Sequence, residues 1–341
     1  MIIRHEAYDL SAQNTFGMKV SCRLYVEVME PEDLLSLDLD ALPQSLFVMG
    51  GGSNLLFTGD FPGTVLHLAN QGHTVMSGST GHLLVRVAAG VVFDDFCAWA
   101  ASEGLWGPEN LSLIPGEVGA SAVQNIGAYG VEAKDIIDTV HAFDRTTRTF
   151  VDIPGSDCGY GYRTSLFKTA WKGRYIITAV TFRLSTIPQP KLDYGGVRKA
   201  LGDSEPTPQV IRDTIIGIRE QKLPDPKVIG SAGSFFCNPV ISREQFERIV
   251  AVAKAENGPE YEVPHYDVGD RVKVPAAWMI DQCGFKGMRL GGAQVYPKQP
   301  LVIVNASGSA TPVEIMALEQ HVIGTIREKY GIELHPEVEH V

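Results

Sequence analysis

The chain has 341 residues, of which 44% are hydrophobic and 20% are charged, and its mean hydropathy is +0.01. This length is enough for about two to three domains with buried cores, and the composition excludes a wholly disordered chain. With 29 Lys and Arg against 40 Asp and Glu, the net charge is −11, and no basic cluster offsets it. We therefore expect no nucleic-acid partner, because phosphate binding normally needs a positively charged face.

The five cysteines are odd in number and never spaced as CxxC: Cys22, Cys97, Cys158, Cys237 and Cys283. This pattern disfavours both a disulfide framework and a structural zinc site, and we expect no metal. The first residues lack the apolar core of a signal peptide, and no apolar run approaches the roughly 18 residues of a membrane span. These features predict a cytoplasmic protein without a membrane-inserted segment.

The first half of the chain alternates short β-rich runs with turns. Strands are predicted over residues 45–50, 64–68, 83–90, 139–143 and 175–184. One helix interrupts them, because Val92, Phe96 and Trp99 fall on one face at helical period and Gly104 provides a stop.

The stretch 185–190 contains two prolines among small polar residues and is typical of a linker, so we place the main domain boundary just beyond it. Helices are predicted to begin at Thr207, Ser242, Pro275 and Thr311, and Gln245 and Glu314 complete capping boxes for the second and fourth of them. A short apolar strand is expected over residues 301–305. The fold class is therefore α+β, with a β-rich first half and a smaller mixed domain after it.

Two glycine-rich segments are candidate ligand-binding loops. The first, VMGGGSNLLF, places Gly50, Gly51, Gly52, Ser53 and Asn54 after a strand, where consecutive backbone N–H groups can converge on an anion. A glycine-rich turn that binds nothing is the alternative. The second, residues 110–132, carries little charge and suits a buried loop around a large, flat ligand with a diphosphate.

Three further residues are candidates for chemistry. Arg163 in YGYRTSLFK can hold a carboxylate bidentately, although an arginine packed on surface aromatic residues is an equal alternative. Ser234 lies among small residues in GSAGSFF, and without a nucleophile elbow or a partner histidine it is better suited to giving a proton than to attacking. Glu337 in HPEV, considered alone, is more typical of a solvated charge.

Together these segments resemble the UDP-N-acetylenolpyruvoylglucosamine reductase family, in order and over nearly the full length. The resemblance is carried by NTFG (14–17), GGGSN, IPGEVGASAVQNIGAYGVE, YGYRTSLFK, KLPDPKV, GSAGSFFCNP, AAWMIDQCGFKGMRLGG (276–292) and the terminal PEV. The long middle glycine segment and GSFF are highly specific, whereas NTFG or GGGSN alone would be weak.

The resemblance implies a vanillyl-alcohol-oxidase-like FAD-binding domain over residues 1–205. It would have two subdomains, about 1–75 and 76–205, and the chain would rejoin it at about 331–341. A substrate-binding domain would cover 206–330, most of it from about residue 222. The implied cofactors are non-covalent FAD and NADPH as hydride donor, and NADPH and a UDP-sugar would use the same cleft of a monomer.

The resemblance also assigns roles to residues. Ser234 would be the proton donor, and Arg163 and Glu337 would polarise the substrate carboxylate. Residues that would engage the UDP-sugar are Tyr162, Tyr194, Lys222, Asn238, Lys286 and Gln299, with Tyr194 on a mobile loop. Residues that would bind FAD are Gly50, Gly51, Gly52, Ser53, Asn54, Pro115, Gly116, Gly119, Ala120, Ser121, Gln124, Asn125, Gly127, Ala128, Tyr129 and Gly130.

This sequence departs from the family pattern at two places, and two other functions are alternatives to the one that the resemblance implies. Cys237 stands where many relatives have a basic residue, and two prolines flank Gln299. A related FAD oxidase of an alcohol or lactone commonly tethers its flavin through His or Cys, and GGGSN contains neither. A flavin- or sugar-nucleotide-binding protein without turnover could lose Ser234, Arg163 or Glu337, but all three are present.

Overall fold

The computed structural model describes residues 1–43, 45–76 and 78–341. The chain forms two compact units, and neither is continuous in sequence. The first unit consists of residues 1–9, 21–52 and 60–221, and the second of residues 10–20, 53–59 and 222–341. The chain therefore passes between the units several times before residue 60.

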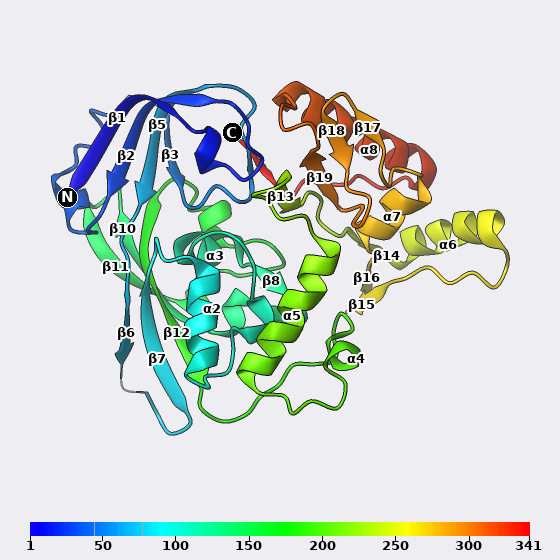
Figure 1. The fold of residues 1–341 in the computed structure, drawn as a ribbon, viewed down its shortest axis with the longest axis horizontal. Coiled ribbons are helices and arrows are strands. Elements are labelled where there is room, and N and C mark those ends of the chain that lie inside the picture. Colours follow the sequence, from blue (N-terminus) through cyan, green and yellow to red (C-terminus); the bar gives the residue numbers. More distant parts are fainter. Residues whose placement is uncertain (44, 77) are drawn as a thin grey trace. The chain divides into compact units, whose positions relative to one another are not determined.

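The first unit contains two large sheets and a small two-stranded one (Figure 1). In the four-stranded sheet β1 (Ile2–Asp9), β2 (Ser21–Val28), β5 (Phe61–Leu68) and β3 (Leu46–Met49) lie side by side in that order, and β5 runs parallel to both neighbours. The second sheet is antiparallel, with the order β11 (Thr149–Pro154), β10 (Ile137–Asp144), β12 (Tyr175–Ser185), β7 (His82–Ala88), β6 (His73–Met76). Parallel strands that are buried on both faces read as apolar runs, which explains why 64–68 was recognisable as β5.

The helices of the first unit are α1 (Asp33–Ser36), α2 (Phe93–Ser102), α3 (Val118–Gln124), α4 (Val197–Leu201) and α5 (Pro208–Lys222). A small hairpin, β8 (Gly127–Ala128) with β9 (Val131–Glu132), follows α3. The ring of Phe96 on α2 stacks on Phe182 of β12 with 4.6 Å between centroids, and Phe93 meets the same ring edge-on. This aromatic contact anchors α2 on the antiparallel sheet.

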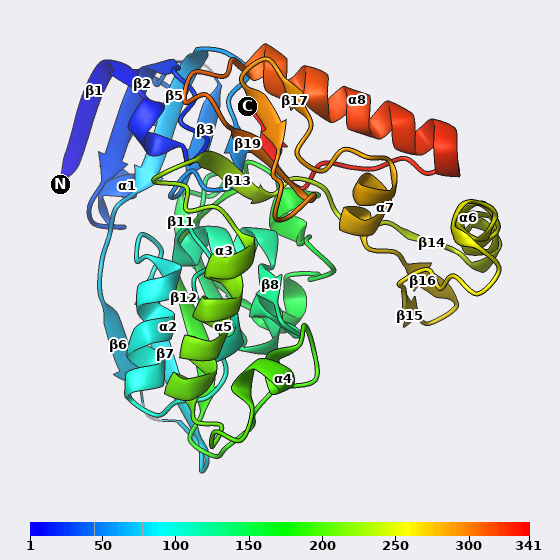
Figure 2. The ribbon, with the colours of Figure 1, turned by 45° about the vertical axis from the view of Figure 1, so that its right-hand side comes forward.

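In the second unit, a four-stranded sheet has the order β13 (Gly230–Ser234), β19 (Val302–Asn305), β18 (Ala293–Val295), β17 (Arg289–Leu290). The long helix α8 (Pro312–Tyr330) packs along β17 and β18 (Figure 2), burying Ile315, Leu318, Val322 and Ile326 at helical spacing. The unit also contains α6 (Arg243–Asn257), α7 (Ala276–Gln282), the small sheet β14 (Val240–Ser242), β16 (Arg271–Lys273), β15 (Tyr266–Val268), and β20 (Glu339–His340) paired with β4 (Leu55–Leu56).

The predicted elements between residues 45 and 330 correspond to observed ones. Ser242 and Thr311 both form the expected capping boxes, with Gln245 and Glu314 as the reciprocal partners. The strands β1 and β2 were not predicted. Most residues of β1 are exposed, so it has no apolar alternation by which to recognise it.

The domain boundary differs from the expectation. Helix α5 and the residues before it, expected in the substrate domain at 206–330, belong to the first unit, whose last residue is 221. The reason is packing: Ile211 and Ile215 of α5 are buried with Trp106, Leu192 and Val197. The C-terminal strand β20 pairs with β4, whose residues lie within the range 1–75 expected for the FAD-binding domain, and both strands belong to the second unit.

An ion pair attaches α5 to α2. Arg212 Nη2 donates to Asp94 Oδ2 over 3.0 Å, and the Leu113 N–H donates to the same carboxylate. Burial of Asp94 opposes its ionisation, but the hydrogen bonds from Arg212 and Leu113 outweigh burial and hold the pKa of Asp94 below its usual range. Removing one partner of this pair would leave the other charge uncompensated, which is expected to lower the free energy of unfolding.

We expect Asp94→Asn to lower the free energy of unfolding of the first unit by about 3 kcal/mol. Because the folded pKa of Asp94 is depressed, its contribution is complete above the unfolded pKa of about 4 and is lost as the pH falls through the folded value. Denaturant titrations at neutral and acidic pH measure both effects. The matched control is Asp193→Asn, whose side chain is 90% exposed in its pair with Arg198, and no measurable change is expected there. Equal effects of the two variants would contradict the role given to Asp94.

Candidate active site

The two glycine-rich segments meet in the first unit. A Cβ built on Gly51 would lie 3.3 Å from the Gly116 Cα, and one built on Gly50 would lie 3.1 Å from Glu117 Oε2. Gly52 is buried and has a φ of +60°, a conformation that side-chain-bearing residues rarely adopt. Glycine is therefore favoured here both by close approach and by backbone conformation, and the second segment meets the GGG turn through the Gly116 backbone and the Glu117 side chain.

The second glycine segment is not the loop that its composition suggested. It contains α3, which begins directly after Glu117, and the β8–β9 hairpin. The Gly119 N–H donates to the Ala89 carbonyl over 2.9 Å, and a Cβ on Gly119 would lie 3.0 Å from that of Ala89. Gly119 thus lets α3 approach the end of β7. Small residues that permit such packing resemble a loop composition, which is why the helix was missed.

Asn125 and Ser121 are buried, and their side chains serve the protein itself. Asn125 is left-handed at φ +48°, its amide donates to the Gly161 carbonyl over 2.7 Å, and its Oδ1 accepts from the Lys134 N–H. The Ser121 hydroxyl donates to the Val118 carbonyl over 2.7 Å. Both residues shape the segment, and any cofactor contact of Ser121 would compete with this internal bond.

Arg163 is held in a defined orientation. Its backbone has a φ of +56°, its Nη2 donates to the Gly127 carbonyl over 2.6 Å, and its guanidinium lies 5.3 Å from the centre of the Tyr162 ring. Any side chain at position 127 would collide with Arg163 Nη1, 2.8 Å from the ideal Cβ. The predicted residues Tyr162, Arg163 and Gly127 therefore gather in one place, and the catalytic role of Arg163 stays a prediction.

Two neighbouring cations were missed by the sequence analysis. Lys168, the last residue of YGYRTSLFK, donates to Gln124 Oε1 over 2.6 Å. Arg219 on α5 interacts electrostatically with Tyr129 and Arg163, and burial lowers the pKa of Arg219. In the sequence, Arg219 could have been noticed from its position just before KLPDP, at the end of a predicted helix.

Tyr194 lies on an irregular segment beside the β8–β9 hairpin. It is 39% exposed and is followed by Gly195 and Gly196, both with positive φ. A Cβ on Gly130 would lie 3.1 Å from the Tyr194 Cβ, and one on Gly195 would lie 2.7 Å from Tyr129 Cδ1. The segment thus rests on the Tyr129–Gly130 turn through glycine contacts, in agreement with the expectation that it is no packed strand.

In the second unit, the GSFF segment and the PEV segment lie side by side. Ser234 ends β13 after Gly233, which has a φ of +73°. The Glu337 N–H donates to the Phe235 carbonyl over 2.8 Å, and the Glu337 carbonyl accepts from Asn54 Nδ2 over 3.0 Å. Three predicted site residues, Ser234, Glu337 and Asn54, are therefore brought together, and Glu337 is only partly exposed rather than fully solvated.

The remaining predicted substrate residues are spread over the second unit. Asn238 Oδ1 accepts from the Ala276 N–H over 2.9 Å, where α7 begins. Gln299 Oε1 accepts from the Leu301 N–H over 3.4 Å within its own turn. Lys222 and Lys286 are exposed, and Cys237 is partly exposed. Cys237 and Asn238 directly follow GSFF, and the Cys237 N–H donates to the His335 carbonyl over 2.9 Å.

The NTFG segment supports β13, a role that the sequence analysis did not assign. Thr15 Oγ1 donates to the Ser231 carbonyl over 2.6 Å, and the Ser231 N–H donates back to the Thr15 carbonyl. A Cβ on Gly230 would lie 2.2 Å from the Phe16 carbonyl oxygen, so only glycine fits. The buried amide of Asn14 holds the turn, accepting from the Met18 N–H over 2.8 Å. NTFG therefore positions the strand that ends in Ser234.

Among the described residues, no group of His, Cys, Asp and Glu is arranged to hold a metal ion. Likewise, within the described ranges every helix is too short or too polar to span a bilayer.

Comparisons with known proteins agree with this arrangement. Residues 38–149 match the family model described as an FAD binding domain, and residues 224–341 match that of the UDP-N-acetylenolpyruvoylglucosamine reductase C-terminal domain. The chain is 47% identical to the UDP-N-acetylenolpyruvoylglucosamine reductase of Bacteroides fragilis, with 98% of each chain covered, and 44% identical to that of Porphyromonas gingivalis, with both covered fully. The Thermus caldophilus reductase structure shares the fold, with a TM-score of 0.67 at 23% identity, covering 100% of this chain and 98% of that one.

The chain therefore belongs to the UDP-N-acetylenolpyruvoylglucosamine reductase family. The predicted family, the α+β fold class with an FAD-binding domain, and the assignment as an FAD-dependent oxidoreductase are confirmed.

Proposed function

We propose that this chain reduces UDP-N-acetyl-3-O-(1-carboxyvinyl)-glucosamine to UDP-N-acetylmuramate with NADPH, as a cytoplasmic monomer in bacterial peptidoglycan precursor synthesis. The observation that carries the proposal is the backbone pairing of GSFF with PEV, which holds Glu337 beside the Ser234 segment. Proton transfer to carbon needs a positioned acid, and the pairing supports Ser234 in that role because it fixes the backbone next to Ser234. Sedimentation or size-exclusion measurements test the proposed monomeric state.

The glycine contact in the first unit fits the cofactor. Gly50, Gly51 and Gly116 carry no side chains of their own where the two segments touch, so a diphosphate can approach backbone N–H groups there, with the Glu117 carboxylate beside them. We propose that the two glycine segments, with Ser53 and Asn54, hold FAD. Bound FAD supplies the transfer of hydride from NADPH to the β-carbon of the enolpyruvyl group.

The protein's own residues stabilise charge and deliver the proton. Arg163, oriented by Gly127, provides a permanent positive charge for the substrate carboxylate as negative charge develops on it. Glu337, in its protonated form, would donate a hydrogen bond to the same group. The Ser234 hydroxyl gives its proton to the α-carbon, so that the C=C bond gains one hydride and one proton. Tyr162, Tyr194, Lys222, Asn238, Lys286 and Gln299 bind the UDP-sugar.

NADPH and the UDP-sugar are expected to use one cleft in turn, because both must reach the same reacting position. Initial-rate lines at varied NADPH should therefore be parallel across substrate concentrations, and excess substrate should inhibit by competing with NADPH. Steady-state kinetics measures both. Intersecting lines, which require both ligands bound together, would contradict the shared cleft.

Tyr194→Phe is expected to weaken substrate binding by about 1 kcal/mol, because one hydroxyl contact to the ligand is lost while the ring stays on the Tyr129–Gly130 turn. The rate of flavin reduction by NADPH should stay close to that of the parent. Titration calorimetry with the UDP-sugar measures the affinity, and an unchanged value would show that the Tyr194 hydroxyl does not touch the ligand.

A further inference from the structure

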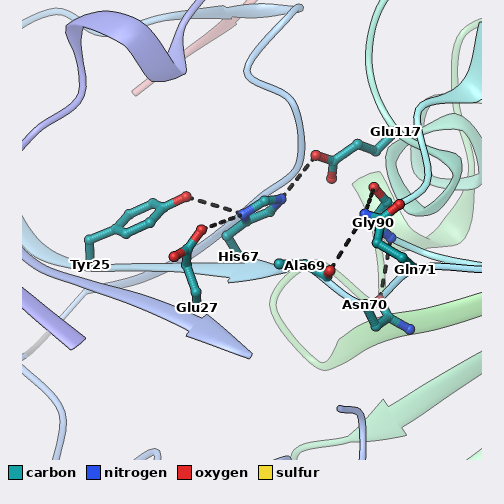
Figure 3. A network of polar contacts seen from close by, with 8 residues as sticks. All are labelled: Tyr25, Glu27, His67, Ala69, Asn70, Gln71, Gly90 and Glu117. Carbon is teal, nitrogen blue, oxygen red and sulfur yellow. Dashed lines mark hydrogen bonds and ion pairs between the residues drawn. The ribbon is translucent and has the colours of Figure 1, made fainter. Parts of the chain in front are cut away.

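A partly buried polar network joins the four-stranded sheet of the first unit to the second glycine segment (Figure 3). His67, on β5, contacts Glu117 Oε1 through Nε2 at 2.9 Å. Its Nδ1 faces β2, where the Tyr25 hydroxyl lies at 3.1 Å and Glu27 Oε1 at 3.7 Å. The side chains of His67 and Glu117 are only 15% and 13% exposed. No role was assigned to any of these residues from the sequence.

The network lies at the contact between the two glycine segments. Glu117 follows Gly116 directly, and its second oxygen, Oε2, is the atom 3.1 Å from the ideal Cβ of Gly50. One carboxylate oxygen therefore faces His67 and the other faces the GGG turn. His67 is itself paired with Met49, the residue before Gly50, across β5 and β3. Both glycine segments are thus connected to His67, one through Glu117 and one through strand pairing.

Hydrogen bonds of the neighbouring backbone fix the positions of His67 and Glu117. Beyond β5, Asn70 Oδ1 accepts from the Gly90 N–H, and Gln71 donates to the Gly90 carbonyl over 2.6 Å (Figure 3). The residues around Gly90 in turn accept hydrogen bonds from the N–H groups of Val118 and Gly119, over 2.9 Å each. His67 and Glu117 therefore project from backbone that is held on both sides, which favours a single geometry for their contact.

Glu117 presents a difficulty for the proposed cofactor site. A carboxylate beside the turn that would hold a diphosphate repels it, and Glu27 adds a second negative charge nearby. The charged groups facing His67 are Glu27 and Glu117, with Tyr25 from β2 and, stacked on Tyr25 at 4.4 Å, Tyr8 from β1. The opposing residue of β3 is the uncharged Met49. Only His67 can supply positive charge within this network.

We infer that His67 is a positioning residue of the FAD site, which holds the Glu117 carboxylate in place and, when protonated, offsets its charge beside the cofactor diphosphate. The inference rests on the proposed FAD contacts of Gly50 and Gly116. Of these two contributions of His67, only the charge depends on pH, whereas the positioning of Glu117 does not. A neutral His67 with its proton on Nε2 still donates to Glu117, while the Tyr25 hydroxyl turns to donate to Nδ1, so the geometry persists and only the charge is lost.

The sign of the pH effect follows from the pKa of His67. Burial alone lowers it, but the hydrogen bond and charge of Glu117, together with Glu27, raise the pKa of His67 above its ordinary value. The positive charge is therefore present below the raised pKa of His67 and is lost as the pH rises through it. FAD should dissociate more readily on the alkaline side.

The test uses apoprotein prepared from the full chain, titrated with FAD between about pH 6 and pH 9, with flavin fluorescence quenching as the readout. For the parent protein, we expect the Kd for FAD to rise about tenfold across this range. His67→Gln keeps a donor for Glu117 without a charge, so its Kd should match the parent's alkaline value and vary little with pH. Glu117→Gln removes the charge to be offset and should bind FAD equally well at both extremes.

The matched control is His141→Gln. His141 contacts an acid, Asp152, at 2.5 Å in the same unit, but on β10 of the other sheet. It should reproduce the parent pH profile. A His67→Gln profile identical to the parent profile would overturn the inference while leaving the FAD site intact. Failure of every form, including the parent, to bind FAD would instead overturn the proposed cofactor site.

Discussion

Ser234→Ala is expected to separate the two half-reactions. Reduction of the bound flavin by NADPH needs no proton from Ser234, so its rate should be close to that of the parent. Reoxidation by the UDP-sugar requires a proton at the α-carbon and should slow by roughly 10²–10⁴-fold. Single-turnover absorbance of the flavin, without oxygen, measures the two steps in sequence.

Two further variants make this result interpretable. Ser234→Cys should be intermediate, because a thiol can also donate a proton. Ser231→Ala lies on the same strand, β13, where Ser231 is tied to Thr15 through its backbone, and it should keep the parent rates. Reoxidation of Ser234→Ala at the parent rate would mean that the serine is only a small residue that fits the site.

The second large effect is expected for Arg163→Lys. Lysine keeps the charge but loses the planar fork, and with it the defined orientation between the Gly127 carbonyl and the Tyr162 ring. We expect kcat/KM for the UDP-sugar to fall by roughly 10²–10³-fold, because the stabilisation of developing charge depends on a positioned donor. Flavin reduction by NADPH, measured in the same stopped-flow experiment, should change little.

The matched control is Arg174→Lys. Arg174 is in the same unit, and its side-chain hydrogen bonds within the described residues go to Asp144, with Oδ2 at 2.7 Å. This variant should keep the parent kcat/KM. An Arg163→Lys enzyme with parent kcat/KM would show that charge alone suffices and that the contact with Gly127 is irrelevant to catalysis.

Local signals in the sequence predicted local structure well. The capping boxes at Ser242 and Thr311 start α6 and α8, because the reciprocal hydrogen bonds need only residues three positions apart. The apolar run that forms β5 was equally visible, since this strand is buried on a parallel sheet. Such features depend on neighbours in the chain, which a single sequence contains.

Contacts between distant segments could not be predicted in the same way. The second unit combines residues 10–20, 53–59 and 222–341, and the two hydrogen bonds between Thr15 and Ser231 span 216 positions. Helix α5 looked like the start of a new domain because a proline-rich stretch precedes it. Its burial of Ile211 against Trp106 is a tertiary contact without a local pattern.

In the candidate site, too, local motifs could be recognised in the sequence, whereas contacts between distant residues could not. Ser234, Arg163 and Glu337 were proposed as site residues because their motifs are distinctive and resemble those of a family. His67 lies in an ordinary strand sequence, TVLHL, and only the pairing of β5 with β2 and its contact with Glu117 reveal its position. A lone histidine on an apolar strand gives no such signal, since its meaning depends on two acids that are 40 and 50 positions away.

The most direct test of the proposed reaction is an anaerobic titration of the purified parent protein. NADPH should bleach the visible absorbance of the bound flavin, and adding one equivalent of the enolpyruvyl UDP-sugar should restore it and yield UDP-N-acetylmuramate. Restoration only when oxygen is admitted would identify an oxidase and contradict the account. A protein that neither contains nor takes up FAD would contradict it completely.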